Sequence, residues 1–165
     1  MELHIITTGG TIDKIYFDAK SDYQVGEPVI GELLEAMGAH FPYTVESALR
    51  KDSLDMTEED RALIRERAAA CEEDKVLITH GTDGMVATGK ALKDLAGKTI
   101  VLTGALQPAA FKGSDAIFNI GCAIGALQTA EPGVYIAMNG QVFAIDDVVK
   151  NVEANRFETV SGAGT

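Results

Sequence analysis

Short apolar runs alternate with segments of helical periodicity along the chain, and this alternation limits the possible folds more than any other feature. Five segments are predicted strands: 2–7, 41–48, 75–79, 99–102 and 134–138. Continuous apolar runs such as 75–79 are typical of buried strands. Four segments between them carry apolar residues at helical spacing: 28–38, 57–71, 83–95 and 112–128. Strands that alternate with helices form parallel sheets with right-handed crossovers. We therefore predict an α/β fold with a doubly wound, mostly parallel five-stranded sheet of order 2-1-3-4-5, as in flavodoxin-like and Rossmann-like proteins.

The remaining segments fit one domain over residues 1–160. Asn139-Gly140 is a strong hairpin signal, so the segment 141–145 should return antiparallel to the fifth strand. Residues 13–27 are polar and rich in turn formers, which predicts a long loop or a loose hairpin. Residues 161–165 predict a frayed tail.

The helical patterns predict which residues are buried. In 28–38 the predicted buried stripe contains Val29, Leu33 and Met37. In 112–128 two glycines, Gly121 and Gly125, predict close packing beside a stripe that contains Ile117, Ile120, Ile124 and Leu127.

Composition argues against several classes of partner. The formal net charge is −11 and tryptophan is absent, which disfavours a nucleic-acid surface of clustered basic and aromatic residues. The acidic balance also disfavours an anionic membrane surface, and no apolar run reaches the length of a membrane span. The amino terminus lacks a signal-peptide pattern, so the expected location is cytoplasmic. Cys71 and Cys122 are expected to be small buried apolar side chains rather than a disulfide or a metal site.

Two glycines end the first predicted strand, and Thr11 follows them. Gly9-Gly10 permits a tight turn that presents the Thr11 hydroxyl at the carboxyl end of the strand, although such a pair alone is often a simple turn. Gly81-Thr82-Asp83 follows the third strand, which neighbours the first in the predicted order. The two segments should therefore face each other across the crevice at the switch point.

These residues have the chemistry of acyl transfer. A threonine hydroxyl is a weak nucleophile that needs a base and donors for the oxyanion it creates. Thr82 and Asp83 supply a second hydroxyl and a carboxylate, and backbone N–H groups around Gly10 and Gly81 could supply the donors. A phosphate-binding loop is the competing interpretation, but neither common phosphate-loop pattern is present.

Two stretches, Thr8–Ile12 and Ile78–Met85, resemble the two signature motifs of bacterial L-asparaginases. Four other segments agree with that family in order and spacing. They resemble its tyrosine-bearing loop, its substrate-carboxylate segment, its fourth strand end and its lysine segment: 21–26, 52–56, 101–107 and 146–150.

The resemblance implies a catalytic role for five residues. Thr11 would be the nucleophile that forms an acyl-enzyme and releases ammonia, and Tyr23 would position or activate it from a lid. Thr82, Asp83 and Lys150 would form a second hydrogen-bonded set with Lys150 as base. A lysine acts as a base only after it has lost its proton, and without the resemblance Lys150 would be interpreted as a surface lysine.

The resemblance also implies how the substrate binds. Ser53 would bind the α-carboxylate and Asp83 the α-ammonium, while the backbone near Ala105 would bind the leaving amide. Gly10 and Gly81 would line the same pocket. Without the resemblance, Ser53 would equally be a turn-forming serine.

Two departures from the family pattern stand out. Leu54 occupies the position where most of the family has a glutamine that grips the substrate. Typical members also have a second, carboxyl-terminal domain, so this sequence of 165 residues is similar to a short-chain form with the amino-terminal domain only. The resemblance then implies that Asp83 and a neighbouring subunit hold the α-ammonium, and that the protein is a homodimer or homotetramer.

The function implied is the hydrolysis of L-asparagine to L-aspartate and ammonia, with no metal and no cofactor. Two alternatives remain: the ammonia-releasing subunit of a tRNA amidotransferase, and an inactive module that binds a small amino acid. Asparagine is preferred over glutamine, although one methylene is worth only about 1–3 kcal/mol in a pocket.

Overall fold

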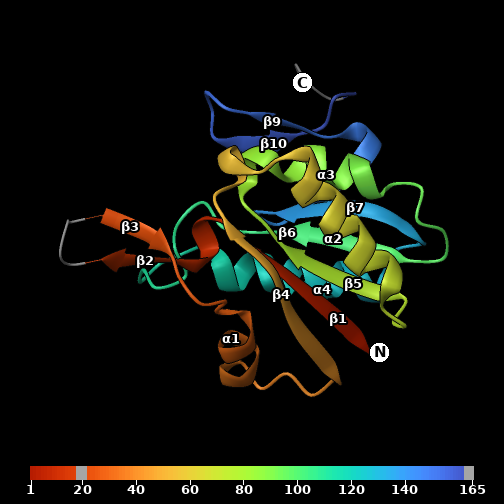
Figure 1. Cartoon of the computed structure of the whole chain (residues 1–165), viewed down its shortest axis with the longest axis horizontal. Coiled ribbons are helices and arrows are strands. Elements are labelled where there is room, and N and C mark those ends of the chain that lie inside the picture. The colour runs from red at the N-terminus through yellow and green to blue at the C-terminus, as the bar shows by residue number, and fades with distance from the viewer. Residues whose placement is uncertain (18–21, 162–165) are drawn as a thin grey trace.

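A six-stranded sheet forms the centre of the protein (Figure 1), of which the computed structural model describes residues 1–17 and 22–161. Five strands are parallel, and the sixth is antiparallel to its neighbour at one edge. Their order across the sheet is β4 (Tyr43–Lys51), β1 (Leu3–Gly9), β5 (Lys75–Thr79), β6 (Thr99–Thr103), β7 (Gly133–Met138) and β8 (Gln141–Ala144). The predicted doubly wound order 2-1-3-4-5 and the returning strand after Asn139-Gly140 are both confirmed.

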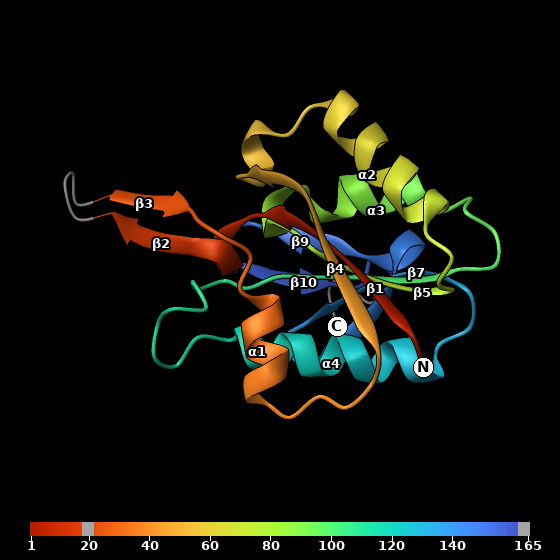
Figure 2. The same ribbon diagram turned by 60° about the horizontal axis from the view of Figure 1, so that its bottom comes forward.

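Helices cover both faces of this sheet (Figure 2). One face carries α2 (Glu58–Ala70) and α3 (Met85–Leu92), and the other carries α1 (Ile30–Ala36) and α4 (Ala116–Thr129). Successive strand residues point to opposite faces: Ile6 belongs to the apolar cluster that contains Ile64 of α2, and Ile5 to the cluster that contains Leu127 of α4. In the part of the chain that the structure describes, no helix combines the length and the hydrophobicity that crossing a membrane requires. Burial on both faces explains why the inner strands β1, β5 and β6 are mostly apolar. The edge strand β4 is partly exposed and more polar.

The limits of two elements differ from the prediction. β4 begins two residues later than predicted and continues to Lys51. The last long helix begins at Ala116 rather than at residue 112, because 111–115 form turns in which the Ser114 amide donates to the Phe111 carbonyl. Periodicity alone does not reveal these turns.

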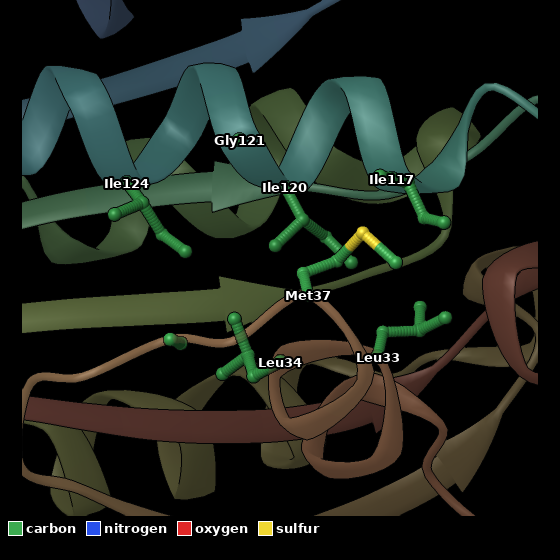
Figure 3. Close-up of a pocket in the computed structure, with 8 residues that line it drawn as sticks. Leu33, Leu34, Met37, Ile117, Ile120, Gly121 and Ile124 are labelled. Carbon is green, nitrogen blue, oxygen red and sulfur yellow. The ribbon is translucent and has the colours of Figure 1, made fainter.

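An apolar groove of about 300 Å³ lies between α1 and α4 (Figure 3). Met37 and Ile117 line it and are 59% and 46% exposed, so the prediction that both are buried is wrong. Leu34 is buried in α1 instead. Among residues 1–17 and 22–161, no neighbouring element comes within 4 Å of the Cβ positions at Gly121 and Gly125, so the prediction that these glycines allow close packing is wrong for this part of the chain.

Two small antiparallel hairpins lie outside the central sheet. β2 (Lys14–Phe17) pairs with β3 (Asp22–Val25) where a long loop or loose hairpin is predicted, and this pair projects from the body (Figure 1). β9 (Val149–Asn151) pairs with β10 (Arg156–Glu158), in a region whose sequence has little pattern. Phe157 is buried and anchors the second hairpin to the core.

The end of the described chain is attached to the body. The Ser161 amide and hydroxyl each donate to the Asp147 carboxylate at 2.8 Å. The rest of the predicted frayed tail, residues 162–165, lies outside the described residues, as does Ser21 of the predicted lid.

Candidate active site

Thr11 stands at the carboxyl end of β1, at the start of the short 3-10 helix η1 (Thr11–Asp13). Gly9 and Gly10 turn the chain there with φ values of 94° and 87°, which side-chained residues rarely adopt. A Cβ at Gly10 would lie 2.5 Å from the Gly81 nitrogen, so the two backbones touch. The turns after β1 and β5 therefore lie side by side, and Thr11 is half-buried next to the second turn.

Lys150 joins Thr82 and Asp83 across 67 or more residues of sequence. Its Nζ donates to Thr82 Oγ1 at 2.8 Å and to Asp83 Oδ1 at 2.6 Å. Thr82 and Asp83 belong to the 3-10 helix η4 (Thr82–Gly84) and Lys150 to β9. The Lys150 side chain is 10% exposed, so the β9–β10 hairpin brings this lysine into a sheltered position. The interpretation as a solvated surface lysine is wrong.

Ser53 lies against the same turn. It begins the 3-10 helix η3 (Ser53–Asp55), is buried, and its Oγ accepts a hydrogen bond from the Gly84 amide at 3.0 Å. A Cβ at Gly81 would lie 2.6 Å from that oxygen. The hydroxyl proton of Ser53 stays available to donate, because the hydroxyl oxygen is the acceptor in this bond. Leu54, the next residue, is 76% exposed.

The loop after β6 is shaped by two residues that sequence reasoning missed. Asp115 accepts hydrogen bonds from the amides of Leu106 at 3.0 Å and Gln107 at 3.1 Å. Burial alone would raise the pKa of Asp115, but these amide donors hold it below the usual range. Asn119 donates to the Gly104 carbonyl at 2.9 Å. The signal available in the sequence was the spacing of four residues between Asp115 and Asn119, which places both side chains on one face at the start of α4.

This network places the backbone of the predicted amide-binding loop. Ala105 is buried between Gly104 and Leu106, which Asn119 and Asp115 hold. A further hydrogen bond holds this loop, because the Ala109 amide donates to the Ile12 carbonyl at 3.1 Å. The loop is therefore attached directly to η1, the helix that carries the predicted nucleophile.

Tyr23 does not belong to the cluster of Thr82, Asp83 and Lys150. It lies on β3, is 48% exposed, and its ring packs edge-on against Tyr16 and Phe111 at centroid distances of 5.6 and 5.5 Å. Among the described residues, no hydrogen bond joins its hydroxyl to Thr11. In this structure Tyr23 contributes an aromatic contact between the projecting hairpin and the loop after β6.

His80 is a structural residue, as the sequence predicts. Its Nδ1 lies 2.7 Å from the Gly81 carbonyl oxygen, which can only accept, so Nδ1 carries the proton. Nε2 then accepts from the Thr88 hydroxyl at 2.7 Å. Burial lowers the pKa of His80 to about 4, so the ring is neutral and fixes the turn before Thr82.

A cavity of about 620 Å³ opens beside the Lys150 cluster. Its lining combines Asp83, Lys90 and Lys150 with apolar side chains: Leu54, Val86, Val148, Val149, Val152 and Val160. Asp83 and Lys150, which can bind an amino acid, thus adjoin an exposed apolar rim that consists of Leu54, Val149, Val152 and Val160. The groove between α1 and α4 has no titratable side chain in its lining and lies apart from this chemistry.

Comparisons with known proteins show which family this chain resembles. The family model for the amino-terminal part of asparaginase matches residues 2–164. A probable periplasmic L-asparaginase of Haemophilus influenzae is 34% identical over 158 residues, covering 88% of this chain and 45% of that protein. A glutaminase-asparaginase of Acinetobacter glutaminasificans is 28% identical, covering 97% of this chain and 53% of that protein. The crystal structure of L-asparaginase I from Vibrio cholerae superposes with a TM-score of 0.84 at 28% identity, covering 96% of this chain and 51% of that one.

The chain thus spans about half the length of the curated relatives it matches. The matched half carries both threonine motifs and the lysine segment, which the structure brings together at the carboxyl ends of β1 and β5. This chain therefore belongs to the asparaginase family, and what it matches is that family's amino-terminal domain.

Proposed function

We propose that this chain hydrolyses the side-chain amide of L-asparagine to L-aspartate and ammonia, with Thr11 as the nucleophile. The observation that carries the proposal is the contact of Lys150 with both Thr82 and Asp83, beside the turn that touches Gly10. Family membership supports the same reaction. The proposal covers residues 1–160 as one catalytic domain.

The first step is attack of Thr11 Oγ on the amide carbon. A threonine ester forms, the hydroxyl proton passes to the leaving nitrogen, and ammonia departs. Backbone amides of the Gly10-Thr11 and Gly81-Thr82 turns are the donors proposed for the oxyanion, because these two turns are in contact. Thr11 is the candidate in the first turn, since the Gly10 amide donates to the Lys51 carbonyl at 2.9 Å. Water then hydrolyses the ester, which releases aspartate and returns the proton to Thr11.

Lys150 and Thr82 supply proton transfer in this proposal. Lys150 Nζ is already within hydrogen-bond reach of Thr82 Oγ1. As an ammonium, Lys150 donates to that hydroxyl, so it must release a proton before it can accept one from Thr82. Asp83 orients the Lys150 side chain through its own hydrogen bond at 2.6 Å.

The same residues can hold the ends of the amino acid. The free hydroxyl proton of Ser53 can donate to the α-carboxylate, and Asp83 is 38% exposed and can accept from the α-ammonium. Leu54 offers no polar group where a donor would help. A second copy of the chain that packs on the apolar rim would complete the binding site, which favours a homodimer or homotetramer.

Steady-state ammonia release tests the proposal. The wild type, Thr11→Ala and Thr129→Ala are compared with asparagine and with glutamine, and the solution mass is measured at the assay concentration. Thr129 is the matched control, because it is exposed on the last turn of α4 and bonds only to its own helix. The proposal predicts activity on asparagine that falls at least about 10³-fold in Thr11→Ala and is unchanged in Thr129→Ala.

Two results would oppose the proposal. Full activity in Thr11→Ala would remove the assigned nucleophile. Binding of asparagine by the wild type with no ammonia release would instead identify an amino-acid-binding module.

A further inference from the structure

Three potential metal ligands lie close together at the amino ends of the parallel strands. Thr11 lies at the opposite, carboxyl ends of these strands. His4 is the second residue of β1, Cys71 follows α2, and Glu73 lies in the loop that leads to β5. A ring nitrogen of His4, the Cys71 sulfur and a Glu73 carboxylate oxygen all lie within 4.8 Å of one another. Parallel pairing of β1 with β5 places these residues together, since His4 aligns with Val76, three residues after Glu73.

The two ring nitrogens of His4 have different surroundings. Nε2 lies 3.1 Å from Glu46 Oε2. Nδ1 lies 2.9 Å from Thr44 Oγ1 and 3.7 Å from Glu73 Oε2. When Nε2–H donates to Glu46, Nδ1 is an acceptor for the Thr44 hydroxyl, and a cation would take the place of that hydrogen bond. A carboxylate on the far nitrogen is the usual partner of a metal-bound histidine.

The distances are close to those of a tetrahedral site. Bonds of about 2.0–2.3 Å to zinc place neighbouring ligand atoms about 3.3–3.8 Å apart. The separation of His4 Nδ1 and Glu73 Oε2 is already 3.7 Å. The Cys71 side chain needs a shift of up to about 1.5 Å to complete the set, judged from the 4.8 Å limit and these bond lengths.

The charges also suit a divalent ion. A Cys71 thiolate and the Glu73 carboxylate together balance a charge of +2. Lys98 lies beside them, with its Nζ bonded to the carbonyls of Cys71 and Glu73 at 2.7 and 2.8 Å and 3.4 Å from the sulfur. The second carboxylate, Glu46, is paired with Arg67 at 3.5 Å and with His4 at 3.1 Å. One sulfur, one imidazole nitrogen and one carboxylate oxygen favour zinc over magnesium or calcium.

We propose that His4, Cys71 and Glu73 form a Zn²⁺ site with water as the fourth ligand. Water and the ion can enter through a cavity of about 160 Å³ whose lining includes Thr44 and Glu73. The bound ion would link β1 to the end of α2 and the start of β5. This site is separate from the proposed amide hydrolysis and does not depend on it.

Titration of the chelator-treated full chain with Co²⁺, followed by its absorption spectrum and by competition with Zn²⁺, tests the site. The wild type is expected to bind one Co²⁺ with a thiolate-to-cobalt charge-transfer band, which Zn²⁺ removes. Cys122→Ser is the matched control and should keep the band, because Cys122 lies on α4 in the opposite helical layer. Cys71→Ser should lose it, and Glu73→Gln should weaken binding at least about 10-fold.

The competing interpretation is a protonated His4 paired with two carboxylates, which uses the same contacts. No Co²⁺ binding by the wild type, or a charge-transfer band that survives in Cys71→Ser, would overturn the proposal. A far-ultraviolet circular dichroism spectrum of Cys71→Ser that matches the wild type shows that loss of the band is not loss of the fold. Zn²⁺ should also raise the thermal midpoint of the wild type and of Cys122→Ser, but not that of Cys71→Ser.

Discussion

A buried carboxyl at the base of the projecting hairpin should make stability depend on pH. Asp13 is 2% exposed, its Oδ1 accepts from the Val29 amide at 3.1 Å, and no partner among the described residues meets its Oδ2. Burial raises the pKa of Asp13 from 3.8 to about 6, and the Val29 amide and the charge of Arg50 oppose this only in part. The folded protein therefore holds a proton on Asp13 that the unfolded chain releases earlier.

The sign and size of the effect follow from this difference. Below about pH 4 Asp13 is protonated in both states and costs nothing. As the pH rises from about 4 to about 6, the unfolded chain ionises first, so the free energy of unfolding falls. The gap between 3.8 and about 6 corresponds to about 3 kcal/mol, at about 1.4 kcal/mol for each pH unit. Above about pH 6 the loss is complete and constant.

Asp13→Asn isolates this contribution, because asparagine keeps the Oδ1 acceptor for Val29 and cannot ionise. Urea unfolding of both proteins at several pH values from 3.5 to 8 gives the difference in unfolding free energy. We expect that difference to move in favour of Asp13→Asn by about 3 kcal/mol between the two ends of the range. Asp55→Asn, at an exposed aspartate, is the control and should show no such movement. A difference for Asp13→Asn that stays constant within about 1 kcal/mol refutes the reasoning.

Two variants test the proposed catalytic groups. Lys150→Met should lower kcat by about 10²–10⁴-fold with a smaller effect on KM. Lys90→Met changes another lysine of the same cavity and should have nearly wild-type activity. A Lys150→Met enzyme with a rate within twofold of the wild type would exclude Lys150 as the base. Tyr23→Phe keeps the ring contacts with Tyr16 and Phe111, so a loss of kcat without a change in thermal midpoint would assign a role to the hydroxyl. If Tyr23→Phe equals Tyr16→Phe and the wild type in rate, Tyr23 acts through packing alone.

The strand order could be predicted because it rests on burial, which leaves a direct trace in the sequence. Runs such as 75–79 are apolar because both faces of the sheet are covered, and the glycine turns follow the strands that lie at the switch point. The contact of Gly10 with Gly81 is a consequence of that order. Lys150 needed the family resemblance, since its position depends on a small hairpin whose sequence has little pattern.

Other features depend on three-dimensional contacts that no local pattern encodes. Asp115 looks like part of a helix in the sequence, but its carboxylate caps backbone amides of a loop eight or nine residues earlier. His4 carries no signal in a strand, and Cys71 resembles a small apolar residue. Their proximity to Glu73 follows from the register of β1 against β5, which becomes known only when the sheet is assembled.

The contacts between turns also determine which parts of the candidate active site can move. Gly10 touches Gly81, and Gly81 touches Ser53, with Cβ positions too close to admit a side chain at either glycine. The turn that carries Thr11 therefore lies in direct contact with the turn that carries Thr82, to which Lys150 is hydrogen-bonded. The β2–β3 hairpin that carries Tyr23 lies outside these contacts. We propose that the hairpin or a second chain on the apolar rim covers the bound substrate. The Tyr23 variants test the first possibility, and the solution mass tests the second.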